Sequence, residues 1–529
     1  MNKFYNLFSV AILAVFGLSA TVPSFFVEAK LASGFVSKTM DAPSAQSVGF
    51  YLNGRYLFDA NGNNFVMRGI NYPHTWFPIE TSSFANIKTR RANTIRVVLS
   101  NGKRWTKNSA TDVANVINLC KTNKLICVLE VHDTTGYGEQ AGAASLAEAV
   151  NYWKEIKSVL IGQEAYVIIN IGNEPYGNNN MTNWITDTKN AVLEMRSAGF
   201  QHMLMVDAPN WGQDWEFIMR DNAADVFASD PNGNVVFSIH MYGVFDTEEK
   251  AQNYISAFVN AGLPLVIGEF AHQHTDGDPN EDAIMSIAQS NGIGYLGWSW
   301  SGNSAQVQYL DMVTNFDPSQ MTWWGNRIIN GENGITQSSR QASVYGIFED
   351  VPTDYWAWDF VERLYNAGIT GGCSTVPLQY CPEANVTRAQ MAVFLEKGLH
   401  NSSFTAPAVP ITFGDTSGHW AQYWIEALKS DGITAGCGAG NYCPENSTTR
   451  AEMAVFLLRA KHGAGYTPPA VGASTGFNDV PTNHWAATWI KQLAAEGITG
   501  GCGTNLYCPG IPVTRAQMAV FLVRTFNLP

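Results

Sequence analysis

The sequence predicts an α/β chain in which a (β/α)8 barrel is followed by three small, mainly α-helical repeats. Over residues 48–345, short apolar runs alternate with longer helical stretches, which is the pattern of repeated βα units around a parallel sheet. The last third of the chain instead repeats one motif three times. No Gly-x-Gly-x-x-Gly follows any apolar run, so an open dinucleotide-binding sheet is disfavoured.

The N-terminus has the form of an export signal. An apolar run follows Lys3 and precedes small residues that end at Ala29. The run is too short to cross a bilayer comfortably, and the sequence contains no later run of about 18 apolar residues, the length that crossing requires. We therefore predict a signal peptide over residues 1–29, a polar leader over residues 30–47, and a secreted mature chain without a membrane span. A retained N-terminal anchor is the alternative.

The barrel is predicted to occupy residues 48–345. A hairpin over residues 49–67, turning at residues 59–63, is expected to close its bottom. Helices are expected between the strands at residues 112–121, 146–160, 184–198 and 251–261. The eight predicted strands are residues 65–71, 94–100, 126–132, 166–173, 202–208, 235–242, 264–270 and 294–300.

Composition restricts the partners of the chain. The formal net charge is −13, and an acidic surface is unsuited to nucleic acid or to an anionic membrane, because phosphate binding requires basic residues. Aromatic residues make up 12% of the chain and include 16 Trp, which suits a neutral ligand that stacks on flat rings. A polysaccharide is the partner that best fits both features.

Two glutamates stand at the ends of predicted barrel strands. Catalytic groups of such barrels lie at the carboxyl ends of the strands, and Glu174 and Glu269 end the fourth and seventh. A pair of carboxylates facing one another can cleave a glycosidic bond, one as a proton donor and the other as an ionised nucleophile. Arg96 would favour the charged form of the nucleophile, and a separation near 5 Å would imply retention of configuration.

Six stretches of the barrel region resemble glycoside hydrolase family 5, most closely its bacterial endo-β-1,4-mannanase branch. The resemblance implies that Glu174 is the acid/base and Glu269 the nucleophile, and that Pro175 replaces a Trp frequent in that branch. It further implies six substrate-binding residues, Arg96, His132, Asn173, His240, Tyr242 and Trp298. The stretches are Val66–Asn71, Ala92–Gly102, Leu129–Asp133, Ser238–Tyr242, Val266–Phe270 and Gly297–Trp300.

Three repeats are predicted over residues 348–400, 413–463 and 477–529. Each contains Trp-Ala, then Gly-Ile-Thr, then a close pair of cysteines, and ends on Thr-Arg-Ala-Gln/Glu-Met-Ala-Val-Phe-Leu. The threonine of that last motif is a helix N-cap residue. Each repeat is therefore expected to form a helix, a cysteine-closed loop and a second helix.

The six repeat cysteines are expected to form disulfides within each repeat. The predicted pairs are Cys373–Cys381, Cys437–Cys443 and Cys502–Cys508, because each recurs in the same context of an exported chain. Zinc is the competing interpretation, but these spacings are poor for zinc. Cys120 and Cys127 differ in context, where two buried thiols are favoured and a bridge remains open.

The repeats resemble the S-layer homology domain in its usual triplicate. The resemblance implies binding of a cell-wall polysaccharide, with Arg388, Arg450 and Arg515 in the binding grooves. The acidic residue of the closing motif remains only as Glu452, since the other repeats carry Gln at that position. The alternative is that the arginines only cap and brace helices.

These features together predict a secreted, cell-surface-attached endo-β-1,4-mannanase that acts on mannan-type polysaccharide. The alternatives are an endo-β-1,4-glucanase of the same family and a surface-layer protein that binds glycan without cutting it. No cofactor and no metal are predicted. His272 and His274, with Asp276 and Asp278, lie in a loop that is expected to contact sugar or to support the loop rather than to bind metal.

Overall fold

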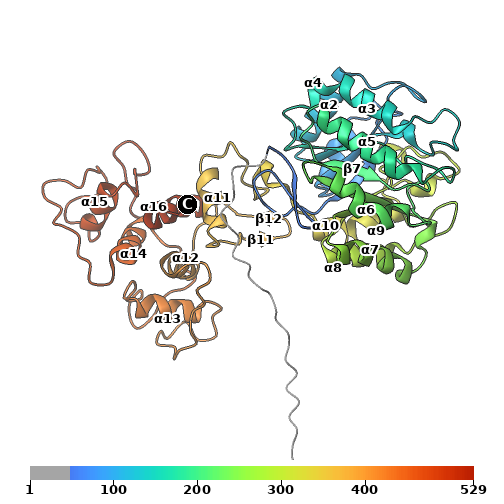
Figure 1. Ribbon diagram of the computed structural model, residues 1–529. Coiled ribbons are helices and arrows are strands. Elements are labelled where there is room, and N and C mark those ends of the chain that lie inside the picture. Colours follow the sequence, from blue (N-terminus) through green and yellow to red (C-terminus); the bar gives the residue numbers. More distant parts are fainter. Residues whose placement is uncertain (1–47, 529) are drawn as a thin grey trace, which may run out of the picture. The chain divides into compact units, whose positions relative to one another are not determined.

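A computed structural model describes residues 48–528, shown in Figure 1. The predicted signal peptide and leader, residues 1–29 and 30–47, lie outside the described residues. Across residues 48–528, the helices are all too short or too polar to cross a membrane.

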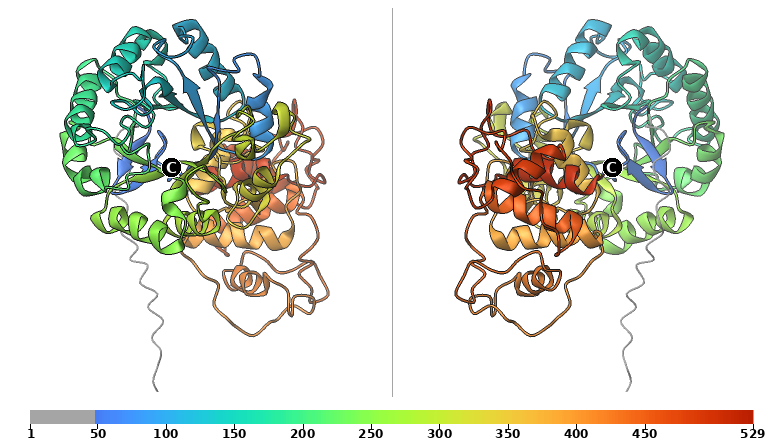
Figure 2. Two further views of the ribbon diagram at one scale, coloured as in Figure 1. Left: turned by 90° about the vertical axis from the view of Figure 1, so that its right-hand side faces the viewer. Right: turned by 90° about the vertical axis from the view of Figure 1, so that its left-hand side faces the viewer.

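Eight parallel strands close into a barrel, which confirms the predicted fold class. Neighbours in sequence are neighbours in the sheet, and β10 pairs with β3 to complete the ring. Figure 2 shows these strands inside a ring of helices. The strands are β3 (Arg68–Tyr72), β4 (Thr94–Leu99), β5 (Ile126–Val131), β6 (Val167–Asn170), β7 (Leu204–Asp207), β8 (Val235–Met241), β9 (Leu265–Phe270) and β10 (Gly294–Gly297).

The barrel helices begin where the sequence supplies capping groups. Ser145 and Glu148 form a reciprocal capping box at the start of one helix, which satisfies backbone N–H groups that have no helical partner. The helices are α1 (Ser82–Thr89), α2 (Ala110–Thr122), α3 (Leu146–Glu155), α4 (Lys157–Leu160), α5 (Asn183–Ser197), α6 (Ile218–Ser229), α7 (Glu248–Ala261), α8 (Glu281–Asn291), α9 (Trp323–Asn330) and α10 (Ile335–Ser338). Short 3-10 turns are η1 (His132–Thr134), η2 (Gly243–Phe245), η3 (Gln308–Leu310), η4 (Thr314–Phe316) and η5 (Ser343–Tyr345).

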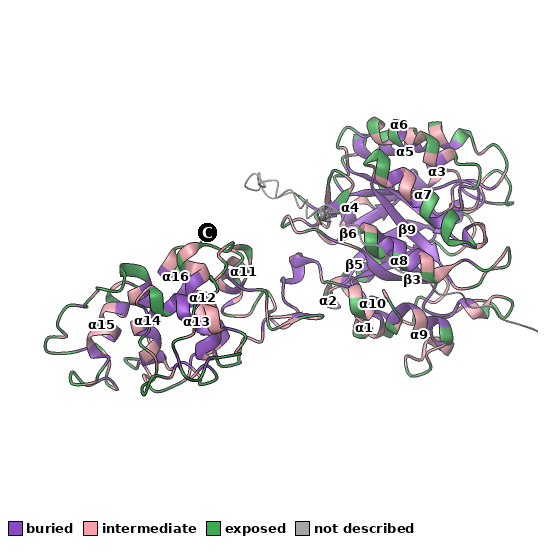
Figure 3. Cartoon of the chain, turned by 90° about the horizontal axis from the view of Figure 1, so that it is seen from below, coloured by how far each residue is buried: buried purple, intermediate pink, exposed green. Residues whose placement is uncertain are grey.

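The barrel strands are buried on both faces, as Figure 3 shows in purple. One apolar cluster lies between the strands and the surrounding helices, and a second contains Val128, Ile168, Val236 and Val266. Alternate residues of each strand point to opposite sides of the sheet, so a strand buried twice must be apolar almost throughout. Polar residues inside such strands therefore stand out as exceptions.

The predicted turn at residues 59–63 is present, because Phe58 and Asn64 form an antiparallel bridge across it, and a further hairpin turn precedes it. Strands β1 (Tyr51–Asn53) and β2 (Tyr56–Phe58) are antiparallel and turn at Gly54, whose φ of +60° suits glycine. Residues 59–63 form a separate turn, because the Asp59 carboxylate accepts two N–H groups inside it. The same side chain accepts the N–H of Ser343 and so joins this turn to a distant segment.

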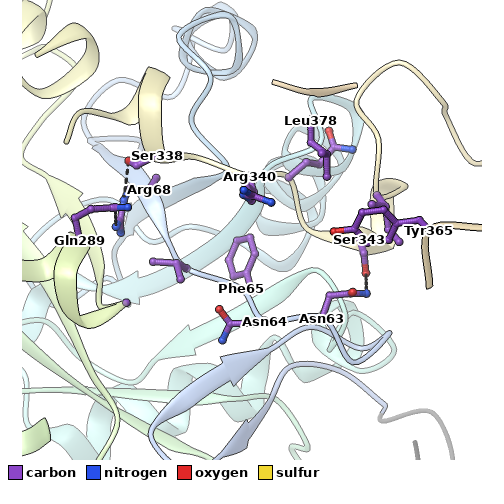
Figure 4. A pocket seen from close by; sticks show the side chains of 14 residues that line it. Asn63, Asn64, Phe65, Arg68, Gln289, Ser338, Arg340, Ser343, Tyr365 and Leu378 are labelled. Atoms are coloured by element: carbon purple, nitrogen blue, oxygen red, sulfur yellow. Dashed lines mark hydrogen bonds between the residues drawn. The ribbon is translucent and has the colours of Figure 1, made fainter. Parts of the chain in front are cut away.

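Arg68 stabilises the amino-terminal end of the barrel. It starts β3, is almost fully buried, and donates to Ser338 and to Gln289, as Figure 4 shows. Its guanidinium also lies over the ring of Tyr295. This end is held by packing and hydrogen bonds, on the side of the barrel opposite the predicted catalytic residues.

The repeats fold as predicted, each with two helices. Thr387, Thr449 and Thr514 are the N-cap residues of α12, α14 and α16, and all three repeats contribute to one apolar core. The second helix of each repeat packs against the first helix of the next, in a cyclic order. The elements are α11 (Trp358–Asn366), β11 (Ser374–Thr375), β12 (Leu378–Gln379), α12 (Arg388–His400), α13 (Gln422–Ser430), α14 (Arg450–His462), α15 (Ala487–Ala495) and α16 (Arg515–Phe526).

Each repeat contains one disulfide, in the predicted pairing. The bonds join Cys373 to Cys381, Cys437 to Cys443 and Cys502 to Cys508. An aspartate braces each loop by accepting two consecutive backbone N–H groups, as Asp350, Asp415 and Asp479 do. Cys120 and Cys127 are free and buried, with their sulfur atoms 2.6 Å apart.

Candidate active site

The eight predicted barrel-site residues meet at the carboxyl ends of the strands. They come from or directly follow β4, β5, β6, β8, β9 and β10, so six strands contribute to one site. Closure of the barrel brings these strand ends together. Arg96 and Glu269, for example, are 173 positions apart and hydrogen-bonded.

Glu174 lies just after β6 in an unusual backbone conformation. Its φ is +40°, in the left-handed region that residues with a Cβ seldom adopt. Its Oε1 atom lies 2.8 Å from Nδ1 of His240. Burial raises the pKa of Glu174, the His240 imidazole lowers it, and Glu269 raises it, with a net increase. A carboxyl with a raised pKa keeps its proton and can act as an acid.

Glu269 is held by two donors. Arg96 donates from Nη1 to Oε1 over 2.7 Å, and the Tyr242 hydroxyl donates to Oε2 over 2.9 Å. These two hydrogen bonds fix the position of both carboxylate oxygens. Burial and then the charge of Glu269 raise the pKa of Tyr242 well above its usual value, so the hydroxyl keeps the proton it donates.

The two carboxylates are close enough to act on one glycosidic bond. One oxygen of Glu174, one of Glu269 and a ring nitrogen of His240 all lie within 4.8 Å of one another. Retaining glycosidases hold their carboxyl groups about 5–5.5 Å apart, whereas inverting enzymes leave about 6.5–9.5 Å for a water molecule. This arrangement suits direct attack by a carboxylate on the sugar.

Arg96 organises the floor of the site. It has no exposed surface, and it donates to Asn173 (2.7 Å) and Asp207 (3.1 Å) in addition to Glu269. Burial alone would lower the pKa of Arg96, but the charges of Glu130, Asp207 and Glu269 outweigh burial and raise it. A permanent positive charge is therefore hydrogen-bonded to Glu269 at this site.

His240 is directed into the site by an irregularity in β8. The register between β8 and β9 shifts between Ile239 and His240, and such a shift re-aims the following side chain. Gly212 makes room for the ring, because a Cβ there would lie 2.6 Å from Nδ1 of His240. Burial would lower the pKa of His240, but Glu269 and Asp207 raise it to about 10, so the imidazole is charged.

Two rings form a flat surface beside the carboxylates. Trp298 and His132 lie nearly parallel, with an interplanar angle of 22° and ring centres 5.7 Å apart. His132 is oriented by a 3.0 Å contact between its Nδ1 atom and Glu130, and Trp298 by a hydrogen bond to Asn303. A sugar ring can stack on the tryptophan while the imidazole reaches its hydroxyl groups.

The sequence-based prediction missed supporting residues inside the strands. Glu130 and Asn170 are buried and contact Arg96 directly, as does Asp207, which the sequence already marked as a polar strand end. His240 and Arg96 more than offset burial and lower the pKa of Asp207 to about 2. The sequence did contain a signal for these residues. A polar residue within an apolar strand needs a buried polar partner.

Other candidate residues fall into different roles. His74 lies 3.1 Å from Asp112 and is buried, which indicates a packing role. His274 stacks on the ring of Tyr242 with centres 4.3 Å apart, so the loop after β9 supports a residue that binds Glu269. His272 packs against Trp323 and Trp324.

The three repeat arginines are buried braces between repeats. Their Nε atoms donate to tyrosine carbonyl groups of the next repeat in cyclic order, and the same tyrosine hydroxyls donate back to the arginine carbonyl groups. Each arginine therefore braces two neighbouring repeats, and such bracing was the alternative that the sequence left open. The pairs are Arg388–Tyr442, Arg450–Tyr507 and Arg515–Tyr380.

Comparison with known proteins assigns both regions to families. The profile described as cellulase (glycosyl hydrolase family 5) matches residues 58–304. The profile of the S-layer homology domain matches residues 347–392, 412–454 and 476–519.

Individual proteins extend this likeness to most of their own length. A mannan endo-1,4-beta-mannosidase from Streptomyces lividans is 58% identical over 303 residues, covering 57% of this chain and 79% of that protein. One from Cellvibrio japonicus is 53% identical, covering 58% and 72%. The solved beta-mannanase of Thermomonospora fusca is 58% identical with a TM-score of 0.56, covering 56% of this chain and 99% of that one. With paired glutamates at the ends of β6 and β9 and relatives this similar, the chain belongs to glycoside hydrolase family 5 and carries three S-layer homology domains.

Proposed function

We propose that the chain is a secreted, cell-surface endo-β-1,4-mannanase that hydrolyses internal bonds of mannan, glucomannan or galactomannan with retention. The proposed reaction type rests on Glu174 and Glu269, which each have a carboxylate oxygen within 4.8 Å of the other. The substrate class rests on the relatives, which are named mannan endo-1,4-beta-mannosidases. The S-layer homology domains support attachment to the cell surface.

In the first step Glu174 donates its proton to the glycosidic oxygen while Glu269 attacks the anomeric carbon. The C–O bond to the leaving sugar breaks and an ester bond to Glu269 forms. Arg96 and Tyr242 hold the Glu269 carboxylate in position for this attack through their hydrogen bonds. Asn173, held by Arg96 and by Thr135, is placed to bind the sugar 2-hydroxyl.

In the second step a water molecule attacks the same carbon and releases Glu269. Glu174, now ionised, takes the proton of that water and returns to its starting state. The charged His240, 2.8 Å from Glu174, stabilises the ionised form between the two steps. One residue thus serves as acid and then as base.

Release of reducing ends from mannan and from carboxymethylcellulose tests the proposal. We expect rapid release from mannan, slow release from carboxymethylcellulose and none from either with Glu269→Gln. A stronger activity on carboxymethylcellulose would favour an endo-β-1,4-glucanase. Binding of mannan without cleavage by the parent chain would favour a surface-layer protein that only binds glycan.

We further propose that the repeats bind cell-wall polysaccharide. Trp356, Trp420 and Trp485 are 60%, 63% and 63% exposed, which is unusual for tryptophan and suits a sugar-stacking surface. Trp420 and Arg515 line a cavity of about 430 Å³, and Trp356 and Arg450 line another of about 310 Å³. Nη2 of Arg515 is buried without a hydrogen-bond partner among residues 48–528.

Sedimentation with isolated cell walls tests this second role. The full chain is expected to pellet, Trp420→Ala to pellet less, and reduction of the disulfides to weaken binding further. Glu269→Gln is the matched control and should pellet like the parent chain. If the parent stays in the supernatant both oxidised and reduced, the repeats act as a spacer or an oligomerisation module instead.

A further inference from the structure

One buried carboxylate in the repeats makes no hydrogen bond within residues 48–528. Glu396, near the end of α12, has no exposed surface, and neither of its oxygens meets a hydrogen-bonding group among residues 48–528. A buried carboxyl group without a partner is costly and requires an explanation, such as a bound ion.

Two further ligand-type side chains face Glu396. His400 lies one turn later on the same side of α12, and Asp431 caps the C-terminus of α13, which packs against α12 (Figure 1). The Nε2 atom of His400 lies 3.6 Å from Glu396 and 2.6 Å from Asp431, and one atom from each of the three lies within 4.8 Å of the others. The C-termini of two helices also meet here, and their partial negative charge favours a cation.

We propose that Glu396, His400 and Asp431 form a binding site for a divalent transition-metal ion of the zinc type. One imidazole and two carboxylates match this class, whereas calcium requires six to eight oxygen ligands. Zinc bonds of about 2.0–2.2 Å place tetrahedral ligands about 3.3–3.5 Å apart, which a small movement of His400 away from Asp431 would reach. The prediction of no metal did not consider these residues, because Asp431 lies 31 positions from His400 and only the fold brings it to the other two.

The other repeats supply natural controls for this site. At the position of Glu396 the second and third repeats carry Leu458 and Val523, which are buried in the ordinary apolar way. The second interface retains an imidazole–carboxylate pair, His462 with Glu496 at 2.8 Å, and so has two of the three ligands. The third interface carries Asn527 at the position of the histidine. Three ligands therefore converge at only the first of the three equivalent interfaces within residues 48–528.

Two variants remove ligands while keeping residues that the fold already accepts. Glu396→Leu introduces the residue of the second repeat, and His400→Asn introduces that of the third. His462→Asn is the matched control, because it removes an equivalent histidine from an interface that lacks the buried carboxylate. Glu396→Leu is expected to fold at least as stably as the parent, since a buried unpaired carboxyl is replaced by an apolar group.

Isothermal titration of the chelator-treated full chain with ZnCl2 measures the proposed site. The parent and His462→Asn are expected to show the same tight site, and Glu396→Leu and His400→Asn to weaken it by at least about a hundredfold. Zinc bound elsewhere, including between Glu174, His240 and Glu269, would persist in the variants. The proposal is overturned if the parent has no zinc site that Glu396→Leu removes, or if His462→Asn weakens binding as much as His400→Asn does.

Discussion

Arg96 of the barrel and Arg450 and Arg515 of the repeats are all buried, but different groups neutralise their charges. In the barrel, Arg96 faces three carboxylates and its pKa is raised despite complete burial. In the repeats, Arg450 and Arg515 donate to neutral backbone carbonyl groups, and burial lowers the pKa of each. Arg96 thus has side-chain partners of opposite charge, whereas Arg450 and Arg515 donate to neutral backbone groups.

Arg96 belongs to the candidate active site, whereas Arg450 and Arg515 hold the repeats together. The network around Arg96 is assembled from several strands and holds Glu269, the proposed nucleophile. The arginine–tyrosine brace recurs in all three repeats, as expected of a contact that every repeat needs, although Arg388 also pairs with Glu452 at 2.8 Å. A buried charge with ionisable partners is therefore the better indicator of an active site in this protein.

The largest expected effect lies in the catalytic pair. Glu269→Gln should lower kcat on mannan by about 10⁴-fold or more, because an amide cannot act as the nucleophile. Glu174→Gln should lower it by about 10²–10⁴-fold, the usual contribution of general acid–base catalysis. Reducing-sugar assays measure both, and circular dichroism checks that each variant is folded. Near-parental activity of either variant would contradict the assigned roles.

Replacing one buried arginine in each region tests the comparison itself. Arg96→Met should cost about 3–5 kcal/mol of stability, because it leaves buried carboxylates unpaired. Arg450→Met should cost about 1–3 kcal/mol, the penalty for an unsatisfied carbonyl, and should leave activity on soluble mannan unchanged. Calorimetry of the full chain measures both. An equal or greater loss for Arg450→Met would show that the brace matters as much as the ionic network.

The disulfides are expected to matter for the repeats alone. Replacing Cys437 and Cys443 with Ser removes a short loop closure worth about 2 kcal/mol. Chemical unfolding should detect that loss, whereas the initial rate on soluble mannan should stay at the parental value. A fall in that rate would indicate that the barrel depends on the repeats.

The smallest expected effect is a shift in pH dependence. The charged His240 lowers the pKa of Glu174, so His240→Asn should raise it. Glu174 would then stay protonated to higher pH. The alkaline limb of the kcat/KM profile should therefore move to higher pH, while the maximum value of kcat/KM falls. His462→Asn, in the repeats, is the control and should leave the profile unchanged. A shift of the alkaline limb to lower pH with His240→Asn would contradict the proposed electrostatic role.

The sequence predicted most of the fold because its signals are local. Apolar runs separated by helical stretches predicted eight strands, and all eight occur within a few residues of the predicted bounds. The threonine N-caps and the cysteine pairs were predicted for the same reason. The turn at residues 59–63 was predicted correctly, and the hairpin turn at Gly54 was missed because two Gly-containing turns lie close together.

The sequence by itself determined the strand order, the two glutamates at strand ends and the threefold repeat, since each depends on residues near one another in the chain. Only the tertiary structure decided what those residues touch. The tight grouping of Glu174, His240 and Glu269, the shared contacts of Arg96 and the isolation of Glu396 among its neighbours all join distant segments. Such contacts depend on how the barrel closes and how the repeats pack, and local periodicity does not encode either.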